Sequence, residues 1–290
     1  MWQLAVIAVV CGAVTAIGAQ TAVNLRARGV ATGFGYLRRS AGFEIAPGLV
    51  PFSSSDSNAR ALAAGIVNTA RLSALGILTA AALGVTIGIA RLSSIPTVAM
   101  LARAYVDVVR NVPVLLQILC WAAVLQRLPD AGLPWHPAPG VALTNRELSF
   151  LWGRVIVSPE FAALFAALSI YTAAFIAENV RGGIAAVPRG QQEAALALGL
   201  SRLAALRTVV LPQALPVIMP PTISQFVSVI KNSSLATAIG YFDLMSITNT
   251  TINQTGQAVE AMALAALFYL TASLAVAAST RALFGARHGI

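Results

Sequence analysis

Long uncharged, apolar runs alternate with polar segments along this sequence. Such runs cover residues 1–25, 72–90, 161–177, 213–230 and 261–280. Each is close to the ~20 residues that an α-helix needs to cross the hydrocarbon core of a bilayer. A further apolar element, residues 98–126, is charged in its first half and uncharged in its second. The pattern predicts an all-α membrane protein with about six transmembrane helices.

The first run forms a unit of its own with the polar segment that follows it. No basic residue precedes it, as would be typical of a signal peptide, so we expect an uncleaved span. Residues 26–60 are rich in Gly, Ser and Arg, which predicts an extramembrane segment. We therefore divide the chain into an extra N-terminal helix with its outer segment, residues 1–58, and a main transmembrane domain, residues 59–290.

Several features modify individual helices. The second helix should begin near Ala59, and Arg71 inside it should lie near an interface or snorkel, because a mid-bilayer arginine costs about 2.5–3.5 kcal/mol. Asn111-Val-Pro113 predicts a kink or a new helix start. Residues 127–160 are rich in Pro and Gly and predict a loop. The prolines of the fifth run predict a helix in the bundle interior, beside a pathway: Pro216, Pro220 and Pro221.

Composition supports the membrane assignment and limits the partners. The chain is 58% hydrophobic and only 10% charged, whereas soluble domains carry about 25% charged residues. The net charge of +9 comes from arginines scattered between apolar runs, which indicates contact with lipid headgroups and proteins rather than with nucleic acid. Cys11 and Cys120 both lie inside apolar runs and indicate neither a disulfide nor a metal site.

The sequence carries no recognisable catalytic site. A phosphate-binding loop needs a lysine after glycine, and the only lysine, Lys231, follows Ile230. There is no His-Glu-x-x-His motif, no Cys/His cluster, and there are only two histidines. We therefore expect no catalytic residues, no metal and no cofactor bound by this chain.

Charged residues at the span boundaries are candidates for the pathway or for helix pairing. Asp107 and Arg110 are three residues apart, as are Glu178 and Arg181, so each pair shares a helix face. We expect local ion pairs rather than ion translocation or substrate contact. Polar groups that end the fifth run should close the helix backbone or face the pathway: Lys231, Asn232 and Ser233.

The polar segment 189–212, between the fourth and fifth runs, has strong local structure of its own. Residues 191–198 are good helix formers, and Gly199 permits a sharp turn after them. Ser201 can cap a second short helix that extends through Arg207. Pro212 should then break the chain before the next span. A plain helical hairpin between two spans is the simplest interpretation of this segment.

The same segment resembles the cytoplasmic EAA loop in the permease subunits of bacterial ABC importers. Its signature is Glu-Ala-Ala, three residues, Gly, nine residues, an aliphatic residue, one residue and Leu-Pro. The valine stands where isoleucine is commoner. The resemblance implies that this loop docks on ATPase subunits. The matching residues are Glu193, Ala194, Ala195, Gly199, Val209, Leu211 and Pro212.

Flanking segments extend the resemblance to the permeases of general or acidic/amide L-amino-acid importers of Gram-negative bacteria. They are the pattern from Tyr105 to Pro113 and the strings SIYTAAFIAENVRGGI and KNSSLATAIGYFDLM. The loop 127–160 is shorter than in relatives of that group. The resemblance implies a type I ABC importer permease-like bundle, multi-pass in the bacterial inner membrane. Its implied partners are ATP-binding cassette ATPases that use the ATP, a second permease subunit (like or different), a periplasmic amino-acid-binding protein and the lipid bilayer.

Two questions stay open at this point. Arginines are divided almost evenly between the two sides of the membrane, so charge does not set the topology; the resemblance places both termini and the loop 189–212 in the cytoplasm. The alternative function is a secondary carrier or channel for small polar solutes that works without an ATPase. No repeat of fixed period is visible that would favour an inverted-repeat carrier.

Overall fold

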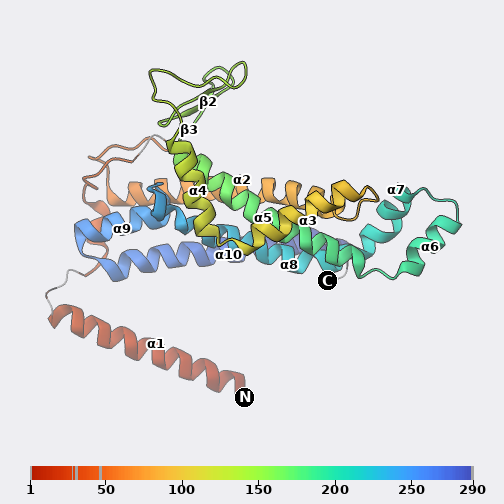
Figure 1. Ribbon diagram of the computed structural model, residues 1–290. Helices are drawn as coiled ribbons and strands as arrows, with labels where there is room; N and C mark the ends of the chain where they lie inside the picture. The colour runs from red at the N-terminus through yellow and green to blue at the C-terminus, as the bar shows by residue number, and fades with distance from the viewer. Residues whose placement is uncertain (1, 28, 30–31, 46–47, 289–290) are drawn as a thin grey trace.

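Four long helices run side by side along one axis of the molecule (Figure 1). They are α2 (Asn58–Ala90), α5 (Pro159–Ala185), α8 (Leu211–Asn232) and α10 (Ala258–His288). The computed structural model describes residues 2–27, 29, 32–45 and 48–288. Helix α5 packs against α2, α4 and α8 and carries the most buried residues, so it forms the centre of the bundle.

The described residues contain four helical stretches that are long and apolar enough to cross a membrane, at 58–90, 159–185, 202–239 and 258–280. A fifth arises if α3 (Pro96–Asn111) and α4 (Val114–Gln126) count as one span. These two meet at a bend of 102°, which confirms the break expected at Asn111-Val-Pro113. Helix α1 (Trp2–Ala27), which lies apart from the bundle in Figure 1, is about 39 Å long at 1.5 Å per residue. It covers the first expected span, residues 1–25.

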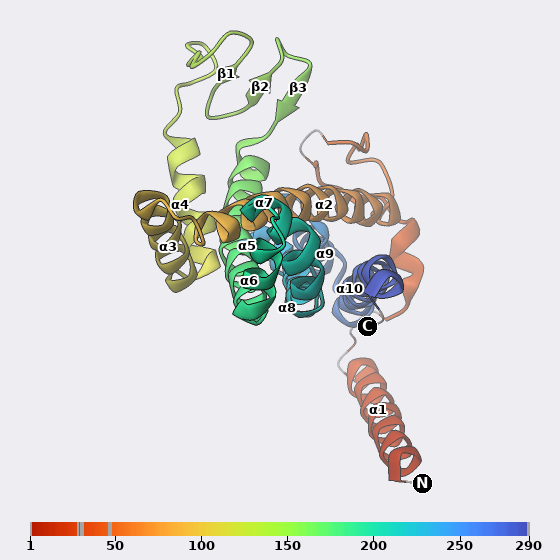
Figure 2. The same ribbon diagram turned by 90° about the vertical axis from the view of Figure 1, so that its right-hand side faces the viewer.

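Shorter elements lie at the two ends of the bundle (Figures 1 and 2). One end, called the inner end below, carries α6 (Arg189–Ala197), α7 (Arg202–Ala205) and the π-helical turn η2 (Leu206–Val210). The opposite, outer end carries η1 (Phe34–Arg38), η3 (Ser233–Ile239) and α9 (Leu244–Thr255), with a small sheet beside it. Helix α9 lies in a polar connection for which no helix was expected.

The loop predicted at 127–160 contains an antiparallel sheet in the order β1-β2-β3. Its strands are β1 (Ala142–Leu143), β2 (Leu148–Phe150) and β3 (Val155–Val157). Leu148 faces Leu143 on one side and Val157 on the other. Strands of two and three residues leave little alternation in the sequence, which explains why only a loop was expected.

Two glycines let α2 and α5 approach each other closely. A Cβ atom at Gly84 would lie 2.6 Å from Cβ of Ile176, and one at Gly88 would lie 2.7 Å from Cβ of Val180. The second would also lie 2.8 Å from the carbonyl oxygen of Ala177. The G-x-x-x-G spacing places both glycines on one face of α2, as in close helix pairs of membrane proteins. The two helices run parallel, so their N-terminal ends share the outer end.

Helix α8 contains three internal prolines, and two of its hydroxyl side chains bond back to carbonyls one turn earlier. Thr222 Oγ1 donates to the carbonyl of Ile218 (2.7 Å), and Ser224 Oγ donates to that of Pro220 (3.4 Å). One face of α8 packs on α5 and α10, but Pro220 and Pro221 are exposed in the single chain. The predicted interior position therefore holds for the packed face alone, and the proline face remains free for a partner or an aqueous pathway.

Candidate functional site

Helix α6 and the turn after it form a rigid tip at the inner end. The amide of Gly199 donates to the carbonyl of Leu196 (3.0 Å), and that of Leu200 donates to Ala195 (3.2 Å). This pair of bonds is a Schellman motif, which requires a left-handed residue after the helix. Gly199 supplies it with φ +84°. The turn expected from the sequence is confirmed in its backbone geometry.

The return path from this tip differs from the prediction. Ser201 Oγ accepts from the amide of Ala204 (3.3 Å), so Ser201 is the expected N-cap. The α-helix it begins ends at Ala205 and continues as the π-turn η2 directly into α8. The break predicted at Pro212 is wrong. Proline tolerates the first turn of a helix because no backbone N–H is needed there, and the wider turn of η2 precedes it.

The signature residues divide into exposed and packed groups. Glu193 and Ala194 are exposed on α6, whereas Ala195 is 4% exposed. Val209 is half-buried in η2, and Leu211 lines an apolar cavity of about 320 Å³ between α2, α5 and α8. Pro212 is exposed in the first turn of α8. The signature thus joins a free helix surface to the base of a membrane helix.

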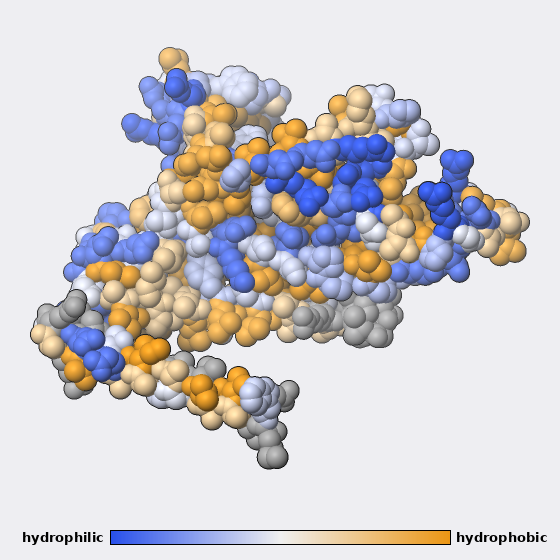
Figure 3. Space-filling model, turned by 60° about the horizontal axis from the view of Figure 1, so that its bottom comes forward, coloured by the Kyte–Doolittle hydropathy of each residue, from blue (hydrophilic) through white to orange (hydrophobic). Residues whose placement is uncertain are grey.

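The hairpin formed by residues 189–210 presents apolar side chains to its surroundings. Leu198, at the tip, is 84% exposed, and Figure 3 shows hydrophobic and hydrophilic side chains together at the end of the molecule that carries α6 and α7. A hydrogen bond of 3.5 Å from Gln213 Nε2 to Gln191 Oε1 ties the helix to the base of α8. Further exposed leucines line the hairpin: Leu196, Leu200 and Leu203. Such a surface suits a partner groove better than water.

Three charged residues lie together just behind the hairpin. Arg181 Nη2 lies 2.5 Å from Glu178 Oε1, as the spacing predicted. Arg91, at the end of α2, pairs with the other oxygen of the same carboxylate. The side chain of Arg91 is only 10% exposed, so the triad ties α2 to α5 at the inner end. The third member, Arg91, was not expected because it lies 87 residues away in the sequence.

The second predicted pair is not formed. The Arg110 guanidinium lies 4.9 Å from the ring centre of Phe175 on α5 instead of contacting Asp107. Asp107 is exposed, and its carbonyl accepts from Asn111 Nδ2 (2.6 Å). An arginine gains more from an aromatic face on a packed helix than from an exposed carboxylate that water already solvates. Arg110 therefore pairs α3 with α5 through a cation–π contact.

The polar residues after the fifth run lie at the outer end, away from the hairpin. Ser233 is buried, and its hydroxyl donates to the carbonyl of Ile230 (2.7 Å), which closes the end of α8. Lys231 is exposed and Asn232 is half-buried. The candidate residues therefore form four separate groups rather than one site: the hairpin, the triad around Glu178, Asp107 and Arg110 on α3, and the outer end of α8.

Asp243 is a further structured residue that the sequence interpretation missed. Its carboxylate accepts from the amide of Ser246 (2.8 Å) and from the Tyr269 hydroxyl (3.0 Å), so it caps α9 and links it to α10. Burial raises the pKa of Asp243 to about 6, although these hydrogen bonds act in the opposite direction. An acidic residue just before a Leu-Met-Ser segment was the available signal.

Comparison with known proteins gives consistent matches. The family described as binding-protein-dependent transport system inner membrane component matches residues 80–286. The general L-amino acid transport system permease protein AapQ of Rhizobium johnstonii is 38% identical over 94% of this chain and 88% of its own length. The putative amino-acid ABC transporter permease protein YhdX of Escherichia coli is also 38% identical, over 95% of this chain and 90% of its own.

Solved structures agree with the sequence matches. The crystal structure of an amino acid ABC transporter with histidines has a TM-score of 0.60 and 28% identity, over 79% of this chain and 94% of that one. The inward-facing methionine ABC transporter MetNI has a TM-score of 0.56 at 18% identity, covering 77% of this chain and 95% of that one. The second match supports the fold alone.

Proposed function

The chain belongs to the family of binding-protein-dependent transport system inner membrane components, and we propose that it is the permease subunit of an ATP-driven importer of L-amino acids. It is a multi-pass inner-membrane protein and a transport component rather than an enzyme. The observation that carries the proposal is the protruding hairpin at the inner end, which holds the complete EAA signature. The naming of both 38%-identical relatives supports amino acids as the substrate class.

The hairpin is suited to receive mechanical work from a partner. Helix α6 is short, exposed and capped by a defined turn, and it contacts η2, which continues into α8. A force on α6 would therefore reach a membrane helix without crossing a flexible linker. We propose that separate ATPase subunits bind and hydrolyse ATP, and that their closure moves α6 and switches the bundle between inward- and outward-open states. This chain would bind no cofactor itself.

The remaining partners follow from the same proposal. A second permease subunit, identical or related, would complete the pathway along the exposed proline face of α8. A periplasmic binding protein would deliver the amino acid at the outer end, and the loop 189–212 would face the cytoplasm. The C-terminal ends of α2, α5 and α10 lie toward the end of the bundle that carries the hairpin (Figure 1), as this topology requires.

Reconstitution tests the proposal against a carrier or channel without an ATPase. The chain, co-expressed with candidate ATPase subunits, is purified and placed in liposomes with labelled L-amino acids. We expect uptake only when ATPase, ATP and a binding protein are all present. Uptake by the permease alone, driven by an ion or substrate gradient, would establish the carrier and reject the importer.

A further inference from the structure

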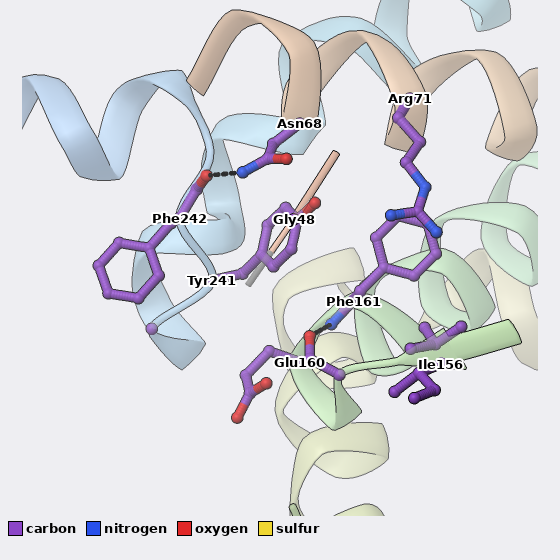
Figure 4. A pocket seen from close by; sticks show the side chains of 11 residues that line it. Gly48, Asn68, Arg71, Ile156, Glu160, Phe161, Tyr241 and Phe242 are labelled. Atoms are coloured by element: carbon purple, nitrogen blue, oxygen red, sulfur yellow. Dashed lines mark hydrogen bonds between the residues drawn. The ribbon is translucent and has the colours of Figure 1, made fainter. Parts of the chain in front are cut away.

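A small pocket at the outer end combines a cationic side chain, an anionic side chain and three aromatic residues (Figure 4). It lies between α2, the first turn of α5, β3 and the 240–242 linker, and has a volume of about 140 Å³. Pockets for drug-sized ligands measure about 300–1,000 Å³, so this one fits a single small solute. Its principal side chains are Asn68, Arg71, Glu160, Phe161, Tyr241 and Phe242.

Arg71 is a charged group of this pocket that lacks a protein counter-ion. Its guanidinium lies 4.7 Å from the ring centre of Phe161 (Figure 4). Among the residues that the structure describes, its side chain has no ion pair and no hydrogen bond with protein. A guanidinium carries five N–H donors, and leaving them unpaired in a half-buried position is unfavourable. An anionic group from outside the chain would satisfy them.

A carboxylate of opposite charge lines the same pocket. Glu160 belongs to the first turn of α5, and within the described ranges its side chain makes no ion pair. A glutamate at a helix N-terminus is usual and stabilises the helix dipole. Here it also gives the pocket a negative group on a different element from the one that carries Arg71. The pocket therefore holds one positive and one negative side chain, opposite in sign to the carboxylate and the ammonium group of a zwitterion.

The aromatic wall between these elements is held in place. Asn68 Nδ2 donates to the carbonyl of Phe242 (2.9 Å), which fixes the linker, and the rings of Tyr241 and Phe161 lie 5.9 Å apart. Burial raises the pKa of Tyr241 to about 12, while the positive charge of Arg71 acts in the opposite direction. Tyr241 is therefore a neutral hydroxyl within electrostatic reach of Arg71.

We propose that this pocket is a contact site for the transported amino acid at the outer end, with Arg71 binding its α-carboxylate and Glu160 facing its ammonium group. The inference rests on the proposed import of amino acids. A charge-assisted, bidentate bond to guanidinium is the strongest single contact that a carboxylate can make here. The phosphate of a lipid headgroup shares the same anionic chemistry and is the competing source.

Direct binding to the permease–ATPase complex without the binding protein tests the site. The probe is the standard L-amino acid that the wild-type complex takes up best, compared with its α-carboxamide. We expect Arg71→Gln to weaken binding of the amino acid about ten- to hundredfold and to leave binding of the amide nearly unchanged. Arg71→Lys keeps the positive charge and should bind the amino acid more tightly than Arg71→Gln but less tightly than the wild type. The matched control is Arg60→Gln, an exposed arginine of the same helix, which should bind like wild type.

The other outcomes separate the explanations. If the wild-type complex takes up no amino acid, the proposed function fails and this site with it. If uptake is normal but Arg71→Gln binds the amino acid as well as wild type, or loses acid and amide equally, the site alone is overturned. If phosphatidylglycerol nanodiscs abolish binding that phosphatidylcholine nanodiscs support, and Arg71→Gln removes this difference, Arg71 holds lipid phosphate instead and the site is overturned.

Discussion

The α2–α5 pair and the inner-end hairpin use small residues in opposite ways. In the pair, Gly84 and Gly88 bring two membrane helices so close that one added methyl group would overlap Ile176 or Val180. In the hairpin, alanines build a short helix of which only Ala195 is buried, and leucines remain exposed. Small residues therefore mark close packing where a second helix covers them, and an exposed helix surface where nothing does.

The largest effect is expected from filling the glycine contact. The double change Gly84→Ala and Gly88→Ala should destabilise the protein by about 3 kcal/mol, because overpacking typically costs 1–3 kcal/mol per site and backbone atoms cannot move aside. Thermal unfolding in detergent measures this loss. Gly182→Ala is the control: a Cβ atom at this position of α5 would meet no atom of another element within 4 Å, so the change should be neutral or stabilising by up to about 1 kcal/mol. Equal stability of both variants would refute the close packing.

The inner-end triad should give the next largest effect. Glu178→Gln leaves Arg91 without a counter-ion although its side chain is only 10% exposed. We expect the free energy of unfolding to fall by about 2 kcal/mol. This is below the 3–5 kcal/mol typical of breaking a fully buried pair, because Glu178 is partly exposed. Asp56→Asn removes the exposed pair with Arg60 and should cost less than about 1 kcal/mol. Matching losses in the two variants would mean that the triad does not hold α2 on α5.

The same contrast explains what the sequence predicts well. Membrane spans produce long apolar runs, and the turn at Gly199 follows from local chemistry, so both could be predicted. The partners of Gly84, Arg91 and Arg110 could not, because each contact joins residues many positions apart. The expected Asp107–Arg110 pair failed for this reason: helix spacing placed the two on one face, but Phe175 on another helix offered a better partner. The break predicted at Pro212 does not occur, because the π-turn η2 leads directly into α8 and accommodates the proline.

Gly199→Val should separate the two regions, since it strains the hairpin and leaves the spans intact. A left-handed conformation costs a non-glycine residue about 1–2 kcal/mol, and more when the side chain is β-branched. We expect nearly normal thermal unfolding but a clear fall in amino-acid uptake per ATP hydrolysed. Gly190 lies on α6, where an added Cβ atom would meet nothing within 4 Å and φ is not positive, so Gly190→Ala should couple ATP hydrolysis to uptake as the wild type does. Full coupling in Gly199→Val would contradict a role for the turn.

The smallest effect on stability, and the most specific one on assembly, is expected at the hairpin tip. Leu198 is 84% exposed, so Leu198→Ser should change the free energy of unfolding by less than about 0.5 kcal/mol. If a partner groove buries this side chain, the change should nevertheless weaken ATPase association severalfold, as measured by co-purification and by titration of the ATPase. Leu133 is 81% exposed at the outer end, so Leu133→Ser matches the chemistry without touching the hairpin and should bind the ATPase normally. Equal association of both variants would show that exposed leucines at the tip are not a docking surface, and the hairpin would then differ from the α2–α5 pair only in lacking a cover.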